Sequence, residues 1–135
     1  MSQSAIYTVN SSAQNVAVNG IINLGTVIRR FGQNLSLSGN AVQISGAGYY
    51  DMDVSITVAP SAVGNVTVTA YKDNIAIPGA VATGSVSTAN NPVNLSISSI
   101  VRESCPCCEG LSNITFVLTG TASSVTNIAT VVEKI

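Results

Sequence analysis

One segment near the middle of the chain, residues 41–58, contains both a turn and a long alternating strand. Gly46 and Gly48 precede the strand, and glycine bends a chain at low cost because it has no Cβ. After them apolar and polar residues alternate without interruption, which is the pattern of a strand with one buried face. The apolar side of this predicted strand consists of Tyr50, Met52, Val54, Ile56 and Val58, and the polar side of Asp51, Asp53, Ser55 and Thr57.

The rest of the chain repeats this pattern in shorter runs. Turn-forming pairs such as Asn19-Gly20, Asp73-Asn74 and Pro78-Gly79 separate the runs, and no segment has the 3.6-residue period of a helix. Strands at this spacing favour an antiparallel sandwich or barrel. We therefore predict an all-β fold, and 135 residues suffice for one domain. The predicted strands are 5–9, 16–18, 26–30, 35–37, 42–44, 49–58, 66–72, 80–86, 93–100, 112–118 and 125–134.

The composition is poor in charge. Hydrophobic residues make up 46% of the chain and charged residues 8%, whereas a typical domain has about 25% charged residues. One explanation is that Ser and Thr occupy the exposed faces of the strands. The other is that much of the surface is buried against further subunits, where charged residues are depleted. The composition favours the second explanation, an oligomer.

The segment around the long strand resembles a known family. The spacing Gly48-x-Tyr50-x-Met52, preceded by Val42-x-Ile44, resembles the central strand of the complement-type and tumour-necrosis-factor-like jelly rolls, usually written Gly-x-Tyr-x-Phe. In this chain, Met stands where that pattern has Phe.

Two later segments extend the resemblance to residues 42–135. Residues 71–79 resemble a strand, turn and small hairpin of the bacterial and bacteriophage members, which write Asn-Gly and then Ile-Pro-Gly. Residues 127–135 resemble the final core strand. The resemblance implies an antiparallel jelly-roll sandwich of about ten strands that works as a homotrimer. It implies a structural or binding role more than a catalytic one.

Within this fold we expect a jelly-roll domain at residues 15–135 and an N-terminal arm at residues 1–14. Members on animal proteins or spore coats commonly carry a collagen-like or coiled-coil stalk. The sequence contains neither a Gly-X-Y repeat nor heptads. We therefore expect the protein to attach through its own surface or through the arm.

Several functional classes lack the residues that they need. The sequence has no His, which removes the commonest general base and the Ser-His-Asp and Cys-His constellations. No glycine-rich phosphate loop is present. With a net charge of −1 and no basic stripe, nucleic acid is not an expected partner. The apolar runs fall far below the roughly 20 residues that cross a bilayer. We expect no enzyme activity, no cofactor and no membrane partner.

Asp51 and Asp53 lie on one strand face, about 7 Å apart by the rise of a strand. They could bind Ca²⁺ with backbone carbonyls, act as an acid and a base, or meet a basic residue across a subunit boundary. A solvated or salt-bridged strand face is the plainest interpretation, because a calcium loop needs further oxygen ligands. Arg29 and Arg30 form the paired positive charge of the sequence. We take these four residues as candidate contacts with a trimer neighbour or another partner.

All three cysteines, Cys105, Cys107 and Cys108, lie in one segment between two predicted strands. Three interpretations stay open: reduced surface thiols, a disulfide within the segment or between subunits, and a thiolate metal site shared between subunits. A catalytic thiol is less favoured than these, since no nearby residue could act as its base. We expect the segment to be dispensable for folding of the monomer.

The expected function follows from this fold, this surface and the absence of catalytic groups. We expect a non-enzymatic, homotrimeric structural protein of a bacteriophage particle, either a capsid decoration or a head-fibre protein, which contacts a capsid or other virion protein. The N-terminal residues do not have the charged and apolar regions of a secretion signal, so we expect synthesis in the bacterial cytoplasm and a location in the virion. Two alternatives are a spore-surface or adhesion head, and a carbohydrate- or receptor-binding module of a phage tail.

Overall fold

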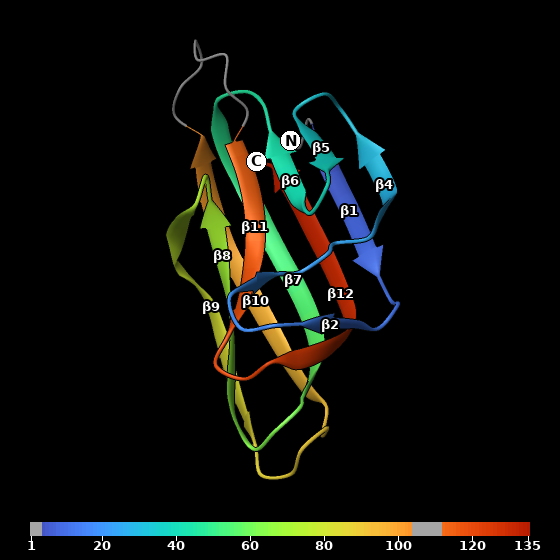
Figure 1. Ribbon diagram of the computed structural model, residues 1–135. Helices are drawn as coiled ribbons and strands as arrows, with labels where there is room; N and C mark the ends of the chain where they lie inside the picture. The colour runs from blue at the N-terminus through green and yellow to red at the C-terminus, as the bar shows by residue number, and fades with distance from the viewer. Residues whose placement is uncertain (1–3, 104–111) are drawn as a thin grey trace.

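The computed structural model describes residues 4–103 and 112–135, and these form two antiparallel sheets packed as a sandwich (Figure 1). Sheet A has the strand order β10-β7-β12-β1-β4, with β2 paired to β12. Sheet B has the order β5-β6-β11-β8-β9, with β3 paired to β11. The strands are β1 (Ala5–Asn10), β2 (Gln14–Val16), β3 (Gly20–Ile21), β4 (Thr26–Phe31), β5 (Leu35–Ser38), β6 (Ala41–Ile44), β7 (Gly48–Pro60), β8 (Gly64–Lys72), β9 (Ile75–Val86), β10 (Val93–Glu103), β11 (Ser112–Thr119) and β12 (Ser123–Lys134). In this described part no helix is long and apolar enough to cross a membrane.

The two faces of β7 are those that the sequence predicts. Its apolar side chains, from Tyr50 to Val58, are at most 3% exposed. Asp51, Asp53 and Ser55 point away from the core. β7 lies inside sheet A, hydrogen-bonded to β10 on one side and to β12 on the other, so it fixes the position of both neighbours. The all-β prediction and the sandwich are therefore confirmed.

The core lies between the sheets, and both contribute large side chains to it. Tyr50 from sheet A and Phe116 from sheet B are fully buried. The Tyr50 hydroxyl donates a hydrogen bond to the Gly46 carbonyl oxygen at 2.8 Å, in the turn that leads from sheet B into sheet A. Burial raises the pKa of this hydroxyl, and the negative charge of Glu103 raises it further. The neutral hydroxyl is therefore the form that the fold favours.

Two local predictions are wrong. Pro78-Gly79 is not a turn between strands but a bulge inside β9, where the register with β8 shifts between Thr69 and Tyr71. Proline is tolerated at such a point because no ladder hydrogen bond needs its missing N–H. The hairpin turn is at Asp73-Asn74, as the sequence predicts, and both residues have positive φ, as a type I′ turn requires. The sequence pattern also does not predict the short strand β3.

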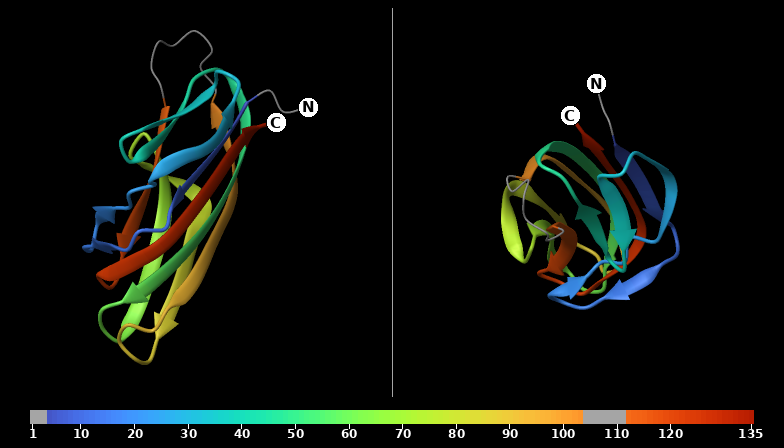
Figure 2. Two further views of the ribbon diagram at one scale, coloured as in Figure 1. Left: turned by 90° about the vertical axis from the view of Figure 1, so that its right-hand side faces the viewer. Right: turned by 90° about the horizontal axis from the view of Figure 1, so that it is seen from above.

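The N-terminal residues, for which an arm was expected, contribute β1 and part of β2 to sheet A. β1 lies between β12 and β4. Ser4 is fully buried, and its carbonyl oxygen accepts a hydrogen bond from the Lys134 N–H at 2.9 Å. Figure 2 shows β1 and β12 side by side, with the start of β1 and the end of β12 at the same end of the sandwich. The ends of the chain are thus fastened to each other within one sheet.

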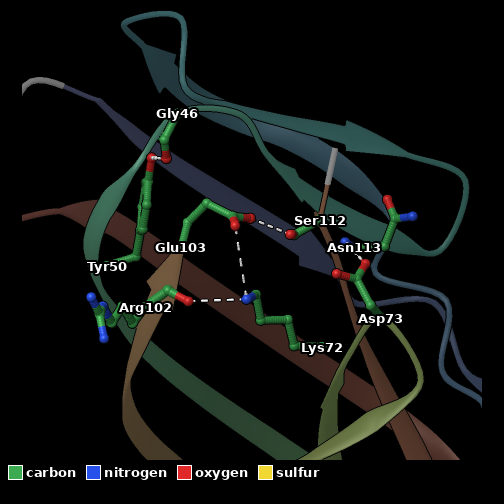
Figure 3. A network of polar contacts seen from close by, with 8 residues as sticks. All are labelled: Gly46, Tyr50, Lys72, Asp73, Arg102, Glu103, Ser112 and Asn113. Carbon is green, nitrogen blue, oxygen red and sulfur yellow. Dashed lines mark hydrogen bonds and ion pairs between the residues drawn. The ribbon is translucent and has the colours of Figure 1, made fainter. Parts of the chain in front are cut away.

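A polar network joins the two sheets at the end where β10 finishes and β11 begins (Figure 3). The Glu103 carboxylate accepts a short hydrogen bond from the Ser112 hydroxyl and lies 4.0 Å from Lys72 Nζ. Lys72 Nζ also donates to the Arg102 carbonyl oxygen at 3.0 Å. Since Glu103 belongs to sheet A and the other two side chains to sheet B, these contacts hold the sheets together at that end.

Candidate functional site

The outer face of sheet A, formed by side chains that point away from the core, carries three of the four candidate contact residues. Strand pairing places them in rows. One row runs from Arg29 on β4 through Tyr7 and Val131 to Asp53 and Ser98. Arg29 and Asp53 are three strands apart in this row, about 14 Å at the usual strand spacing. Within the described residues no ion pair joins them.

The two aspartates differ in their surroundings. Asp53 is exposed, and its Oδ1 accepts a hydrogen bond from the Ser98 hydroxyl at 2.6 Å. Asp51 is half-buried and stands between Ile100 on β10 and Glu133 on β12. Within residues 4–103 and 112–135, no three side chains of the metal-binding types lie close enough together to hold a metal ion.

The two arginines, Arg29 and Arg30, also differ in their surroundings. Arg30 turns toward sheet B, where its Nε donates to the Leu35 carbonyl oxygen at 2.5 Å. Arg29 points outward, and its side chain makes no hydrogen bond or ion pair within the described residues. The strand that carries them, β4, is exposed along its whole length and forms the edge of sheet A. Arg29 is thus the arginine available to a partner.

A shallow depression, the sheet A hollow, lies in the middle of this face and has a volume of about 380 Å³. Its floor consists mainly of small outward side chains on three neighbouring strands, so a larger side chain from outside could enter it. Val131 contributes an exposed apolar group to its wall. The lining residues are Asp53, Val54, Ser55, Ser96, Ile97, Ser98, Ala129 and Val131.

A second surface, the β9–β10 edge, lies where the outermost strands of the two sheets meet. A groove of about 330 Å³ there is lined mainly by apolar residues from Ile75 to Pro78 and by Ile100 and Val101. Ile75 is 73% exposed and Ile100 62% exposed. Beside it, the Arg102 guanidinium lies over the Tyr49 ring, 5.9 Å from its centroid. The sandwich therefore presents two unlike surfaces, a hollow face and an apolar edge.

Sequence reasoning placed Asp51 and Asp53 on one face but missed the hollow and the apolar edge. The sequence does contain a signal for the exposed apolar residues of these two surfaces. Val131 and Ile100 occupy outward positions in strands whose other outward residues are mostly small or polar. The hollow itself depends on which strands are neighbours, which the sequence pattern does not give. Cys105, Cys107 and Cys108 lie outside the described residues.

The sequence matches no protein-family model and no curated protein. Solved structures do match. Eiger TNF from S. frugiperda has a TM-score of 0.76 at 14% identity, over 99% of this chain and 92% of that one. The PRD1 vertex protein P5 has a TM-score of 0.66 at 14% identity, over 100% and 99%. The globular domain of zebrafish complement 1qA has 0.63 at 4% identity, over 94% of each chain. The chain therefore has the jelly-roll fold that tumour-necrosis-factor-like and complement-type proteins share.

Proposed function

We propose that this protein is a homotrimeric, non-enzymatic structural protein of a bacteriophage particle, where it decorates the capsid or forms a head fibre. The similarity to the PRD1 vertex protein P5 over nearly the whole of both chains supports the setting. The absence of His from the sequence supports a role without catalysis. In this proposal the chain is made in the bacterial cytoplasm and contacts a capsid or other virion protein.

The observation that carries the trimer is the presence of two unlike surfaces on one protomer. A ring of three subunits is built by one contact repeated around an axis, in which one patch of each subunit meets a different patch of the next. The β9–β10 edge offers exposed aliphatic side chains, Ile75 and Ile100. The sheet A hollow offers a recess floored by small residues. We assign the edge of each protomer to the hollow face of its neighbour.

Charged side chains on the outer face of sheet A also remain open to a neighbour. Arg29 has no partner within the described residues, and Asp53 is bonded to a neutral hydroxyl and not to a cation. Both side chains are therefore open to a neighbouring subunit, Asp53 in the hollow and Arg29 on β4 at the far edge of the same face. In the proposal Arg29, Asp51 and Asp53 border the contact between subunits, while Arg30 serves the fold by its bond to Leu35.

The trimer is tested by the mass of the protein in solution. Three chains of 13.7 kDa give about 41 kDa, and light scattering during size-exclusion chromatography should find this mass at micromolar concentration. Ala129→Arg places a long cation in the hollow and should give a folded monomer. Asn65→Arg, on the outer face of sheet B, is the matched control and should remain trimeric. A monomeric wild type would overturn the trimer.

The particle setting has a test of its own. Virions purified from the strain that carries the gene should contain this chain, and a cryo-electron microscopy map should show it as projections with threefold symmetry on the head. If mass spectrometry of pure virions finds none of this chain, the particle role fails, whatever the oligomeric state.

A further inference from the structure

The outer face of sheet B contains a polar pocket of about 360 Å³, which we name the sheet B pocket. Its floor is formed by β6 and β11. Its walls are the turn between β8 and β9 and the turn between β5 and β6. It lies on the opposite side of the sandwich from the sheet A hollow and shares no residue with it. Its polar lining residues are Ser38, Gln43, Asp73, Asn74, Asn113 and Thr115.

One wall of the pocket is fastened to the floor. The Asp73 N–H donates to the Asn113 carbonyl oxygen at 2.9 Å, and the Asn113 N–H donates to Asp73 Oδ1 at the same distance. Figure 3 shows the Asp73 carboxylate directed at the backbone of Asn113, with the Asn113 side chain pointing away from it. Both bonds to Asn113 use its backbone, so its side-chain amide stays available. The turn is held in place before any ligand arrives, which lowers the entropic cost of binding.

The floor presents polar groups that the fold does not use. Gln43 and Asn113 are opposite each other in the β6–β11 register, which places their Cβ atoms about 5 Å apart. Thr115 projects from the same face of β11 two residues later. Within the described residues, none of these three side chains makes a hydrogen bond. Two amides and a hydroxyl, each able to donate and to accept, thus converge on one space.

The lining selects a class of ligand. Among the described residues that line the pocket none is Lys or Arg, and the Asp73 carboxylate would repel an anion. Ala41 is the apolar residue of the lining, so an apolar ligand would bury little against it. Amides, hydroxyls and one carboxylate suit a neutral ligand with many hydroxyl groups, which donate and accept in the same manner. The half-buried Tyr71, opposite Thr115 on β8, adds an aromatic ring next to the floor.

We propose that the sheet B pocket binds a neutral saccharide, with Gln43, Asn113 and Thr115 as the floor contacts and Asp73 accepting a sugar hydroxyl. The pocket is open and polar, so a single sugar unit should bind weakly, with a dissociation constant on the order of 1–10 mM. Several protomers in one particle would then reach useful avidity on a glycan-coated surface. The floor residues Gln43, Asn113 and Thr115 line neither the sheet A hollow nor the β9–β10 edge, although Asp73 lines both the pocket and the edge. Binding by the floor residues therefore does not rest on the trimer.

The test is a titration of the full-length, isotope-labelled protein followed by amide NMR. The probes are methyl glucoside, methyl galactoside, methyl mannoside and N-acetylglucosamine, each raised to about 50 mM, above the expected dissociation constant. At least one sugar should shift the amides of residues 38–43, 71–74 and 113–115 in a saturable manner. Asn113→Ala and Gln43→Ala should each weaken that binding about 3- to 10-fold, the value of one hydrogen bond. Asn65→Ala, also an outward Asn of sheet B but at its other end, should bind as the wild type does.

Three outcomes would overturn the proposal: no saturable shift with any of the four sugars, shifts that map to another surface, or unchanged binding in both Asn113→Ala and Gln43→Ala. The spectra themselves report whether each variant is folded. Saccharide binding by the floor residues is expected in the trimer and also in the monomeric Ala129→Arg variant. A failure of the trimer and a failure of the sugar site are therefore separate results.

Discussion

The two outer faces of the sandwich are built on the same backbone pattern but differ in what they expose. On sheet A, large apolar side chains such as Phe31, Ile100 and Val131 are more than a third exposed. Sheet B also exposes Ile75 and Val81 on its edge strand β9, but its outer face over β6, β8 and β11 carries mainly hydroxyl and amide groups. Thr67 and Thr83 share a hydrogen bond between β8 and β9 at 3.0 Å. Exposed apolar surface on a sheet is costly in water, whereas cross-strand threonines are not. The difference indicates that one face is suited to contact with protein and the other to contact with water and polar ligands.

The largest expected effect is on the free energy of unfolding, and it tests whether the two sheets differ only on their outer faces. Both sheets contribute to one core, so Ile56→Ala in sheet A and Ile114→Ala in sheet B should each lower the free energy of unfolding by about 2–5 kcal/mol, because both side chains are fully buried. Ser55→Ala, on the outward side of β7, should change it by less than about 0.5 kcal/mol. Urea denaturation of the three variants measures this. Equal losses at residues 55 and 56 would show that the faces of β7 are misassigned.

The next effect compares two exposed aliphatic residues on different surfaces. Ile100 at the β9–β10 edge is 62% exposed, and Val81 on the outer face of sheet B is 50% exposed. If the edge meets a neighbouring subunit, Ile100→Ser removes buried apolar area and should weaken the trimer by about 1–2 kcal/mol per contact. Val81→Ser should leave the assembly unchanged. Sedimentation velocity over a dilution series measures dissociation, and equal behaviour of the two variants would remove the distinction between the surfaces.

The local pattern of the sequence was sufficient to predict which side chains of a strand face the core. It was not sufficient to predict the hollow and the pocket on the outer faces of the two sheets. Alternation in β7 decides which of Tyr50 and Asp51 is buried, because a strand has a strict period of two. It does not decide that β12 and β10 flank β7, and without those neighbours the sheet A hollow has no floor. The sheet B pocket needs Asp73 and Asn113, which are 40 positions apart in the chain, to meet. Pro78-Gly79 was misassigned because the same residue pair suits a turn and a bulge.

A smaller effect concerns the junction between the two sheets, where the Tyr50 hydroxyl reaches the turn at Gly46. Tyr50→Phe removes this hydrogen bond and should cost about 0.5–1.5 kcal/mol at pH 8. The pKa of Tyr50 is raised in the fold, so its contribution is complete below the unfolded pKa of about 10 and is lost as the pH rises through the folded value. The gap in unfolding free energy between wild type and variant should therefore narrow above about pH 10. A constant gap between pH 8 and about pH 11 would contradict the raised pKa.

The smallest expected effect on stability concerns two buried threonines on the inner face of sheet A. Thr8 and Thr130 are opposite each other on β1 and β12, at most 1% exposed, and neither hydroxyl has a hydrogen-bond partner within the described residues. A buried hydroxyl without a partner destabilises a fold, and valine has nearly the same shape. Thr8→Val and Thr130→Val together should therefore raise the free energy of unfolding by about 0.5–1 kcal/mol. Ser112→Ala is the control from sheet B: its buried hydroxyl is bonded to Glu103, so the same loss of a hydroxyl should destabilise the protein. A double valine variant less stable than the wild type would contradict this prediction, because the two hydroxyls would then contribute to stability, as they would by binding a buried water.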